Sequence, residues 1–173
     1  MRDDRHKWNP QVAHHDPFVI SDVTLREVSL SRQIMVSGPR VRDDLAHAIG
    51  WPAIASGETY CLSLRRDRVL VVYGLQMLTG WDSTTEQAVS DVTDGFRVFD
   101  LSGARALAVL RRGAELSLHV PSASAARLVF GLNCILYRYA TDDLFRIHVA
   151  RGYGEALVLN LRKAMQAAAD HTV

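Results

Sequence analysis

The chain has 173 residues, of which 48 % are hydrophobic, and its 20 basic and 19 acidic side chains leave a formal net charge of +1. This length fits one compact domain or two closely packed halves with a real core. The balanced charge, with no Lys/Arg run longer than two, argues against nucleic-acid binding. No apolar stretch approaches the roughly 20 residues of a membrane helix. The N-terminus lacks the apolar core of a secretory signal. We therefore expect a cytoplasmic protein that contacts neither nucleic acid nor membrane.

Three segments organise the chain. Residues 1–17 mix charged residues with His, Pro and Asn and show no periodicity, which predicts a mobile, solvated arm. We assign residues 18–88 to a first half of the folded part and residues 89–173 to a second half, which carries a C-terminal helix. Residues 23–36 alternate roughly between apolar and polar side chains, which predicts extended structure.

The two halves repeat one pattern. Residues 34–50 and residues 97–113 each contain an apolar extended stretch, then Ser-Gly, then a helical segment closed by Gly. Each copy is followed by two apolar runs separated by a short polar turn, in residues 60–74 and 134–149. The sequence therefore predicts an α+β protein built from two similar β-α-β-β units related by a pseudo-twofold repeat.

Start and stop signals place the helices. Ser37 or Gly38 and Pro39 mark the start of a first helix that Gly50 ends, and Ser102 is the expected cap of a second helix over residues 104–112. Residues 83–89 fit a short helix. Residues 151–169 carry apolar side chains at three- and four-residue spacing, from Tyr153 onward, which predicts a long C-terminal helix with one face in the core.

The sequence contains no evident catalytic constellation, so we predict no catalytic residue and no metal site. Cys61 and Cys134 could form a disulfide or a metal half-site, but two small buried side chains are favoured, because CxxC spacing is absent. Asp91, Asp94 and Asp100 could bind a cation or act as acid and base, although turn chemistry explains them more simply. His119 and His148 lie in strand-like contexts, which favours hydrogen-bonded core or interface histidines.

Four stretches of the second half resemble a known family. They are "VSDVTDGFRVFDLSGARALAVLRRG", "LSLHVP", "LFRIHVARGYG" and "EALVLNLRKAM". Their Leu-Ser-Gly motif, the strand before it and the Arg-containing helix after it are similar to the gamma subunit of heterotetrameric sarcosine oxidase, within the folate-binding aminomethyltransferase-like superfamily. The family's Gly-Pro-Asp-Glu-Trp motif and the helix after it are reduced here to Gly80-Trp81-Asp82.

The resemblance implies two adjoining antiparallel sheets with helices packed outside. It also implies a non-catalytic accessory subunit of a flavin-dependent, tetrahydrofolate-linked complex that oxidises an N-methyl amine. The FAD, FMN, NAD and tetrahydrofolate would then be carried by alpha, beta and delta-type partner subunits, with no cofactor in this chain. Two alternatives stay open: a stand-alone protein that binds folate or another small molecule between its halves, and a tetrahydrofolate-dependent methyltransferase-like enzyme.

An accessory subunit needs an apolar surface for its partner. The candidate interface residues lie in loops that neither repeat needs for its strands, and they are Trp51, Leu75, Met77, Leu78 and Trp81. We expect an isolated chain to expose this surface or to cover it by forming a homodimer.

Overall fold

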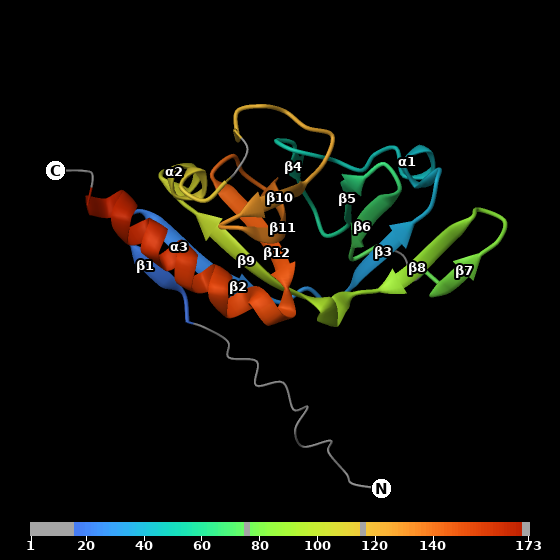
Figure 1. The fold of residues 1–173 in the computed structure, drawn as a ribbon, viewed down its shortest axis with the longest axis horizontal. Helices are drawn as coiled ribbons and strands as arrows, with labels where there is room; N and C mark the ends of the chain where they lie inside the picture. The colour runs from blue at the N-terminus through green and yellow to red at the C-terminus, as the bar shows by residue number, and fades with distance from the viewer. Residues whose placement is uncertain (1–15, 75–76, 115–116, 171–173) are drawn as a thin grey trace, which may run out of the picture.

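The computed structural model describes residues 16–74, 77–114 and 117–170, which fold into two sheets that lie side by side (Figure 1). Sheet A has seven strands, in the order β1-β2-β9-β12-β11-β10 with β4 added parallel to β11. Its strands are β1 (Phe18–Ile20), β2 (Val23–Val28), β4 (Ile54–Ala55), β9 (Phe96–Ser102), β10 (Ala126–Val129), β11 (Leu132–Tyr139) and β12 (Leu144–Ala150). Apart from β4, all neighbouring strands are antiparallel.

Sheet B has five antiparallel strands, in the order β5-β6-β3-β8-β7. Its strands are β3 (Gln33–Ser37), β5 (Tyr60–Arg65), β6 (Arg68–Val72), β7 (Gly80–Asp82) and β8 (Gln87–Asp91). The predicted hairpin at Arg66-Asp67 is confirmed as the turn between β5 and β6. The predicted helix over residues 83–89 is wrong, because these residues form the turn and most of the second strand of the β7–β8 hairpin.

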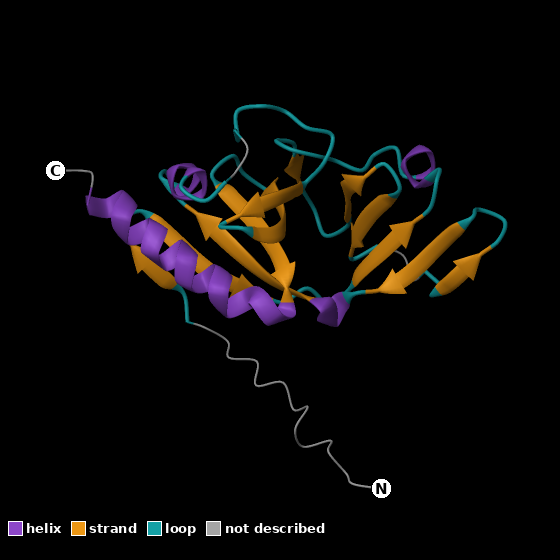
Figure 2. Ribbon diagram, viewed as in Figure 1, coloured by secondary structure: helices purple, strands orange, loops and turns teal. Residues whose placement is uncertain are grey.

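The helices are few and cover the two sheets unequally (Figure 2). α3 (Gly154–Ala169) is the long helix predicted at the C-terminus, and α2 (Ala106–Arg111) and α1 (Val41–Asp44) are short. Single 3-10 turns occupy Thr93–Gly95 and Arg151–Tyr153. α3 packs against β1, β12 and α2 on the outer face of sheet A, whereas at sheet B the short helix α1 packs against β6. Helices outside both sheets are therefore only partly realised.

Apolar side chains form three clusters in this arrangement. The first lies between sheet A and its helices and contains Phe99, Leu136, Ile147 and the α3 residues Leu157 and Leu161. The second lies between the sheets, where Leu62 and Leu70 of sheet B meet Tyr137 of sheet A. The third covers the outer face of sheet B, from Ile34 and Val69 to Val89. The alternation of side chains along a strand explains why both faces of sheet B are apolar.

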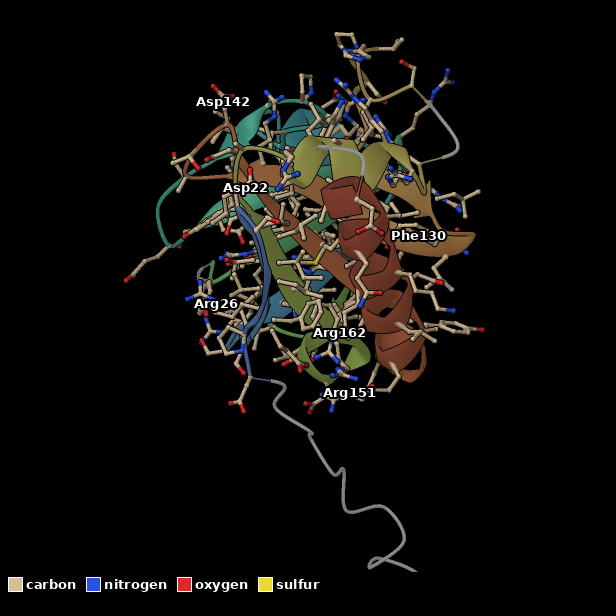
Figure 3. All side chains as sticks on the ribbon, turned by 90° about the vertical axis from the view of Figure 1, so that its left-hand side faces the viewer. Asp22, Arg26, Phe130, Asp142, Arg151 and Arg162 are labelled. Carbon is tan, nitrogen blue, oxygen red and sulfur yellow. The ribbon has the colours of Figure 1, made fainter. Side chains whose placement is uncertain are left out.

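The predicted apolar stripe of α3 faces sheet A. Leu157, Leu161, Ala164 and Met165 are buried, whereas Tyr153 at the start of the stripe is 58 % exposed. Figure 3 looks at this side of the molecule and shows Arg162 on α3, with Arg26 of β2 on the side of the sheet away from that helix. The guanidinium of Arg162 lies over the ring of Phe18, 4.5 Å from its centre, and so joins α3 to β1.

The two Ser-Gly pairs take equivalent positions in the two sheets. Ser37 and Ser102 each end a strand and lie opposite the first residue of β6 and of β12, respectively. The backbone N–H of Gly38 donates to the carbonyl of Asp67 at 2.9 Å, and that of Gly103 donates to the carbonyl of Asp143 at 3.1 Å. Neither serine caps a helix, because the N-cap positions of α1 and α2 have no side-chain cap and the helices start later.

Each of these glycines touches a hairpin that arrives from elsewhere in the chain. A Cβ on Gly103, which has φ +119°, would collide with the carbonyl of Asp22 in the β1–β2 turn, and one on Gly38 would collide with the carbonyl of Glu86 in the β7–β8 turn. The glycines are thus required for the close approach of these turns.

A hairpin exchange links the halves. The β1–β2 hairpin precedes β3 in the chain but pairs with β9 in sheet A, and the β7–β8 hairpin precedes β9 but pairs with β3 in sheet B. The expected boundary between residues 88 and 89 lies inside β8, so the sheets do not follow that division. Of the expected arm, residues 1–15 lie outside the described residues.

Candidate docking site and a buried polar chain

Trp51 does not belong to a docking surface. Its side chain is 2 % exposed and stacks on Phe145 with ring centres 6.1 Å apart, and its indole N–H donates to the carbonyl of Leu118 at 2.9 Å. A large aromatic side chain with its polar atom satisfied stabilises the core of sheet A. The prediction that Trp51 is an interface residue is therefore corrected.

Three of the other candidates come together at sheet B. Leu78 is 92 % and Trp81 66 % exposed, and Met77 packs partly against the outer face of the sheet. With Val89 they line a hollow of about 650 Å³. Leu75 lies outside the described residues. We call Met77, Leu78 and Trp81 the docking surface; it lies by the β7–β8 hairpin, at the opposite end of the molecule from α3 (Figure 1).

The three aspartates do not form one site. The carboxylate of Asp91 accepts the N–H of Thr93 at 2.9 Å, as expected of turn chemistry, and an exposed Asp94 contacts Arg151 at 3.2 Å. Asp100 instead lies inside the protein with 3 % exposure. No group of three or more His, Cys, Asp or Glu side chains that could hold a metal occurs among the described residues.

Both cysteines are free and buried, which confirms the structural interpretation. Burial raises the pKa of Cys61 and raises that of Cys134 to about 12. A thiol in such surroundings is inert as a nucleophile. His119 is exposed in a turn rather than in a strand, so its predicted setting is wrong.

Asp100 binds two arginines across neighbouring strands. Arg146 donates two hydrogen bonds to the carboxylate of Asp100, from Nε to Oδ1 at 2.7 Å and from Nη2 to Oδ2 at 3.0 Å. Arg26 donates a third hydrogen bond to Oδ2 at 3.3 Å. The register places Arg26 and Arg146 directly opposite Asp100 on β2 and β12. Burial opposes the charge of Arg146, but its hydrogen bonds to Asp100 and the charge of that carboxylate outweigh burial and raise the pKa of Arg146.

A hydrogen-bond chain runs from Arg146 between the two sheets. Arg146 Nη1 contacts the hydroxyl of Tyr60 at 3.2 Å, the hydroxyls of Tyr60 and Tyr137 are 2.8 Å apart, and Tyr137 contacts His148 Nε2 at 2.8 Å. The other ring nitrogen, Nδ1, lies 2.8 Å from Oε1 of Gln33. The hydrogen-bond chain thus passes from sheet A to sheet B, back to sheet A, and once more to sheet B.

Chemistry fixes the direction of these bonds. The amide nitrogen of Gln33 donates to the carbonyl of Thr93 at 3.3 Å, so the amide oxygen Oε1 is the atom that faces His148. An amide oxygen can only accept a hydrogen bond. His148 therefore carries its proton on Nδ1, Nε2 accepts from Tyr137, and Tyr60 donates to Tyr137. Burial, and then the charge of Arg146, lowers the pKa of His148 to about 3 and keeps the ring neutral.

This polar chain joins the two sheets. His148 has no exposed surface and uses both ring nitrogens within the protein, which confirms the predicted hydrogen-bonded core histidine. Burial also raises the pKa values of Tyr60 and Tyr137, so both stay protonated as donors. The sequence patterns missed Gln33, Tyr60, Tyr137 and Arg146. The one sequence signal for these residues was the presence of polar side chains within otherwise apolar strand segments.

Comparisons with known proteins show which fold this is. The chain is similar to a chain of heterotetrameric sarcosine oxidase from Corynebacterium sp. U-96, solved with pyrrole 2-carboxylate, with a TM-score of 0.63 and 22 % identity over 87 % of this chain and 88 % of that one. It is also similar to glycine cleavage system aminomethyltransferase T from Bartonella henselae, with a TM-score of 0.51, 16 % identity and 82 % of this chain against 45 % of that one.

No family model and no curated protein matches the sequence. The chain therefore shares its α+β fold with these two proteins. None of the described helices is long and apolar enough to span a membrane.

Proposed function

We propose that this chain is a non-catalytic accessory subunit of a sarcosine oxidase-like complex that oxidises an N-methyl amine. The observation that carries the proposal is the fold match that spans 87 % of this chain and 88 % of a chain of heterotetrameric sarcosine oxidase. The match to aminomethyltransferase T covers only 45 % of that enzyme, so this chain spans about half of its length.

The side chains fit a subunit that contributes surface rather than chemistry. The buried histidine, tyrosines and arginine use their polar atoms on one another, and the docking surface leaves Leu78 and Trp81 in water. Under this proposal, flavin, NAD and tetrahydrofolate belong to alpha, beta and delta-type partners. The two halves derive from one duplicated unit with a pseudo-twofold relation, and the equivalent Ser-Gly positions support this.

Co-purification tests the proposal. An affinity-tagged chain, expressed together with the genes that flank its own, should bring down flavin-containing subunits in a stoichiometric complex. The chain expressed alone should show no visible flavin absorbance and no oxidation of sarcosine. A chain that alone binds flavin and oxidises sarcosine would contradict the accessory role, and one that binds a folate tightly without partners would favour the stand-alone binding protein.

A further inference from the structure

A groove outside the docking surface is lined by arginines that form no ion pair with a described residue. An open groove of about 590 Å³ lies between the sheets, with walls from β3, β5 and β6 on one side and β9, β10 and β11 on the other. Its apolar lining includes Met35, Leu64, Phe96 and Ile135, and its polar lining includes Arg65 and Arg68. No carboxylate occurs among its lining residues in the described part of the chain.

A bulge in β5 brings Arg65 to the groove, beside Arg68 of β6. The pairing of β5 with β6 shifts between Ser63 and Arg65, so that Arg65 lies directly opposite Arg68. Successive residues of a regular strand face opposite sides, yet Leu64 and Arg65 both line the groove. A bulge that redirects a side chain in this way is a recurrent feature of functional sites.

The arrangement has an electrostatic cost within the chain. Like charges directly opposite each other destabilise a strand pair. Arg65, Arg66 and Arg68 form no ion pair with a described residue, and the same turn contributes one carboxylate, Asp67. Three arginines against one aspartate leave this hairpin end with a charge of +2.

The corresponding hairpin of sheet A differs. There, between β11 and β12, Arg138 pairs with Asp142 at 3.0 Å. Arg127, on the far wall of the groove, donates hydrogen bonds from Nη1 to the carbonyls of Ser124 and Ala126 and forms no ion pair with a described carboxylate. The positive charge at the groove therefore comes from the β5–β6 hairpin of sheet B and from Arg127 on β10, the edge strand of sheet A.

We propose that this groove receives a segment of a partner subunit in which carboxylates alternate with apolar side chains. Arg65 and Arg68 bind its carboxylates, since a guanidinium matches a carboxylate in a bidentate geometry. Met35, Phe96 and Ile135 contact the apolar side chains. The inference rests on the proposed function and adds a second contact region, between the sheets, to the docking surface.

A peptide titration on the full chain tests the groove directly. The probe is a fluorescein-labelled peptide of alternating leucine and glutamate, followed by fluorescence anisotropy. We expect saturable binding that weakens with salt and falls about tenfold in each of Arg65→Gln and Arg68→Gln. Arg42→Gln, an exposed arginine of α1 outside the groove, is the matched control and should bind as the wild type does.

Three outcomes of this titration overturn the proposal. The first is that a peptide with glutamine in place of glutamate binds equally well. The second is that both arginine variants bind the peptide as tightly as the wild type. The third is that the chain binds 1-naphthoate but not the peptide, which would make the groove a site for small anions. Both arginines are exposed, so the variants should fold, and the melting temperature should stay equal or rise as the repulsion is removed.

The assembled complex separates this inference from the proposed function. In the co-expression experiment, Arg65→Gln/Arg68→Gln should reduce recovery of the partner subunits at least tenfold at moderate salt, with Arg42→Gln unchanged. Equal recovery would overturn the groove inference and leave the proposed function intact. If the wild-type chain brings down no partner, the proposed function fails and the peptide titration still decides what the groove binds. A concentration-dependent homodimer that only the arginine variants dissolve would make a second copy the occupant and overturn the proposal.

Discussion

Sheet A and sheet B have corresponding strand orders but differ in what covers their outer faces. In sheet A, the chain leaves β12 and forms α3, which buries the outer face under Leu157 and Leu161. In sheet B, the chain leaves β6 and reaches β7 with no helix among the described residues, and Leu78 and Trp81 stay exposed. The outer face of sheet A is thus covered by a helix of the same chain, whereas sheet B presents an apolar surface and arginines that form no ion pair with a described residue. We expect partners to bind at sheet B and stability to depend most on sheet A.

The largest loss of stability should follow removal of the carboxylate that joins three strands of sheet A. Asp100→Ala leaves Arg146 buried without its partner, which typically costs about 3–5 kcal/mol of unfolding free energy. Urea unfolding followed by circular dichroism measures this loss. The matched control is Asp142→Ala, whose exposed ion pair with Arg138 contributes under about 1 kcal/mol. Similar losses in both variants would show that the buried ion pair contributes no more to stability than the exposed one.

The second-largest loss of stability should follow the removal of a side chain packed between α3 and sheet A. Leu161 is fully buried in the cluster between α3 and sheet A, and Leu161→Ala should lower the unfolding free energy by about 2–5 kcal/mol through a cavity. Leu159→Ala on the same helix is the control, because that side chain is 55 % exposed and should change stability by under about 0.5 kcal/mol. A small effect at Leu161 would mean that α3 is not needed to complete sheet A.

The polar chain between the sheets predicts how stability depends on pH. The folded pKa of His148 is about 3 and an unfolded histidine has about 6.5, so the unfolded state binds the extra proton between these values. His148 therefore contributes stability above pH 6.5 that is lost as the pH falls toward 3, with a slope of up to about 1.4 kcal/mol per pH unit. Denaturant titrations at several pH values measure it.

A substitution of His148 tests whether this residue causes the pH dependence of stability. His148→Gln removes the titrating ring, so its stability should vary less between pH 7 and pH 4 than that of the wild type. His119→Gln is the control, because His119 is exposed and should leave the pH dependence unchanged. An equally steep loss in His148→Gln would assign the effect to carboxylates instead.

The smallest effect on stability, and the largest on binding, should come from the docking surface of sheet B. Leu78→Ser and Trp81→Ser alter exposed side chains and should each change the unfolding free energy by under about 0.5 kcal/mol. Recovery of the partner subunits in the co-expression experiment should fall at least tenfold, as it does when central aromatic residues of interfaces are removed. A marked loss of stability would instead place these side chains in the core.

Periodicity predicted the parts of this fold that local chemistry decides. The strands around Tyr60 to Val72, the strand ending at Ser102 and the C-terminal helix all follow apolar spacing, and the structure confirms them. The short helix expected over residues 83–89 failed because Glu86 adopts a positive φ in the β7–β8 turn, and the strand Gln87–Asp91 pairs with β3. Ser37 and Ser102 resembled helix caps, yet tertiary contacts with distant turns determine these positions.

The candidate site could be predicted only in part. Leu78 and Trp81 were accessible to sequence reasoning as apolar residues in a loop, but Trp51 has the same signal and lies in the core. Its burial depends on Phe145 and Leu118, which are distant in sequence. The contacts of Asp100 with Arg26 and Arg146, and of His148 with Gln33, depend on strand register and sheet packing, which composition and spacing do not specify.

The hairpin exchange also sets the order in which the protein can fold during synthesis. Among the described strands β1 and β2 are made first, yet their partner strand β9 is made only after all five strands of sheet B. Until then β2 presents an unpaired edge that is prone to aggregation. A chain cut between residues 88 and 89 should accordingly yield two fragments that fail separately and regain structure when mixed. We therefore expect the two sheets to fold as one unit rather than as two modules in tandem.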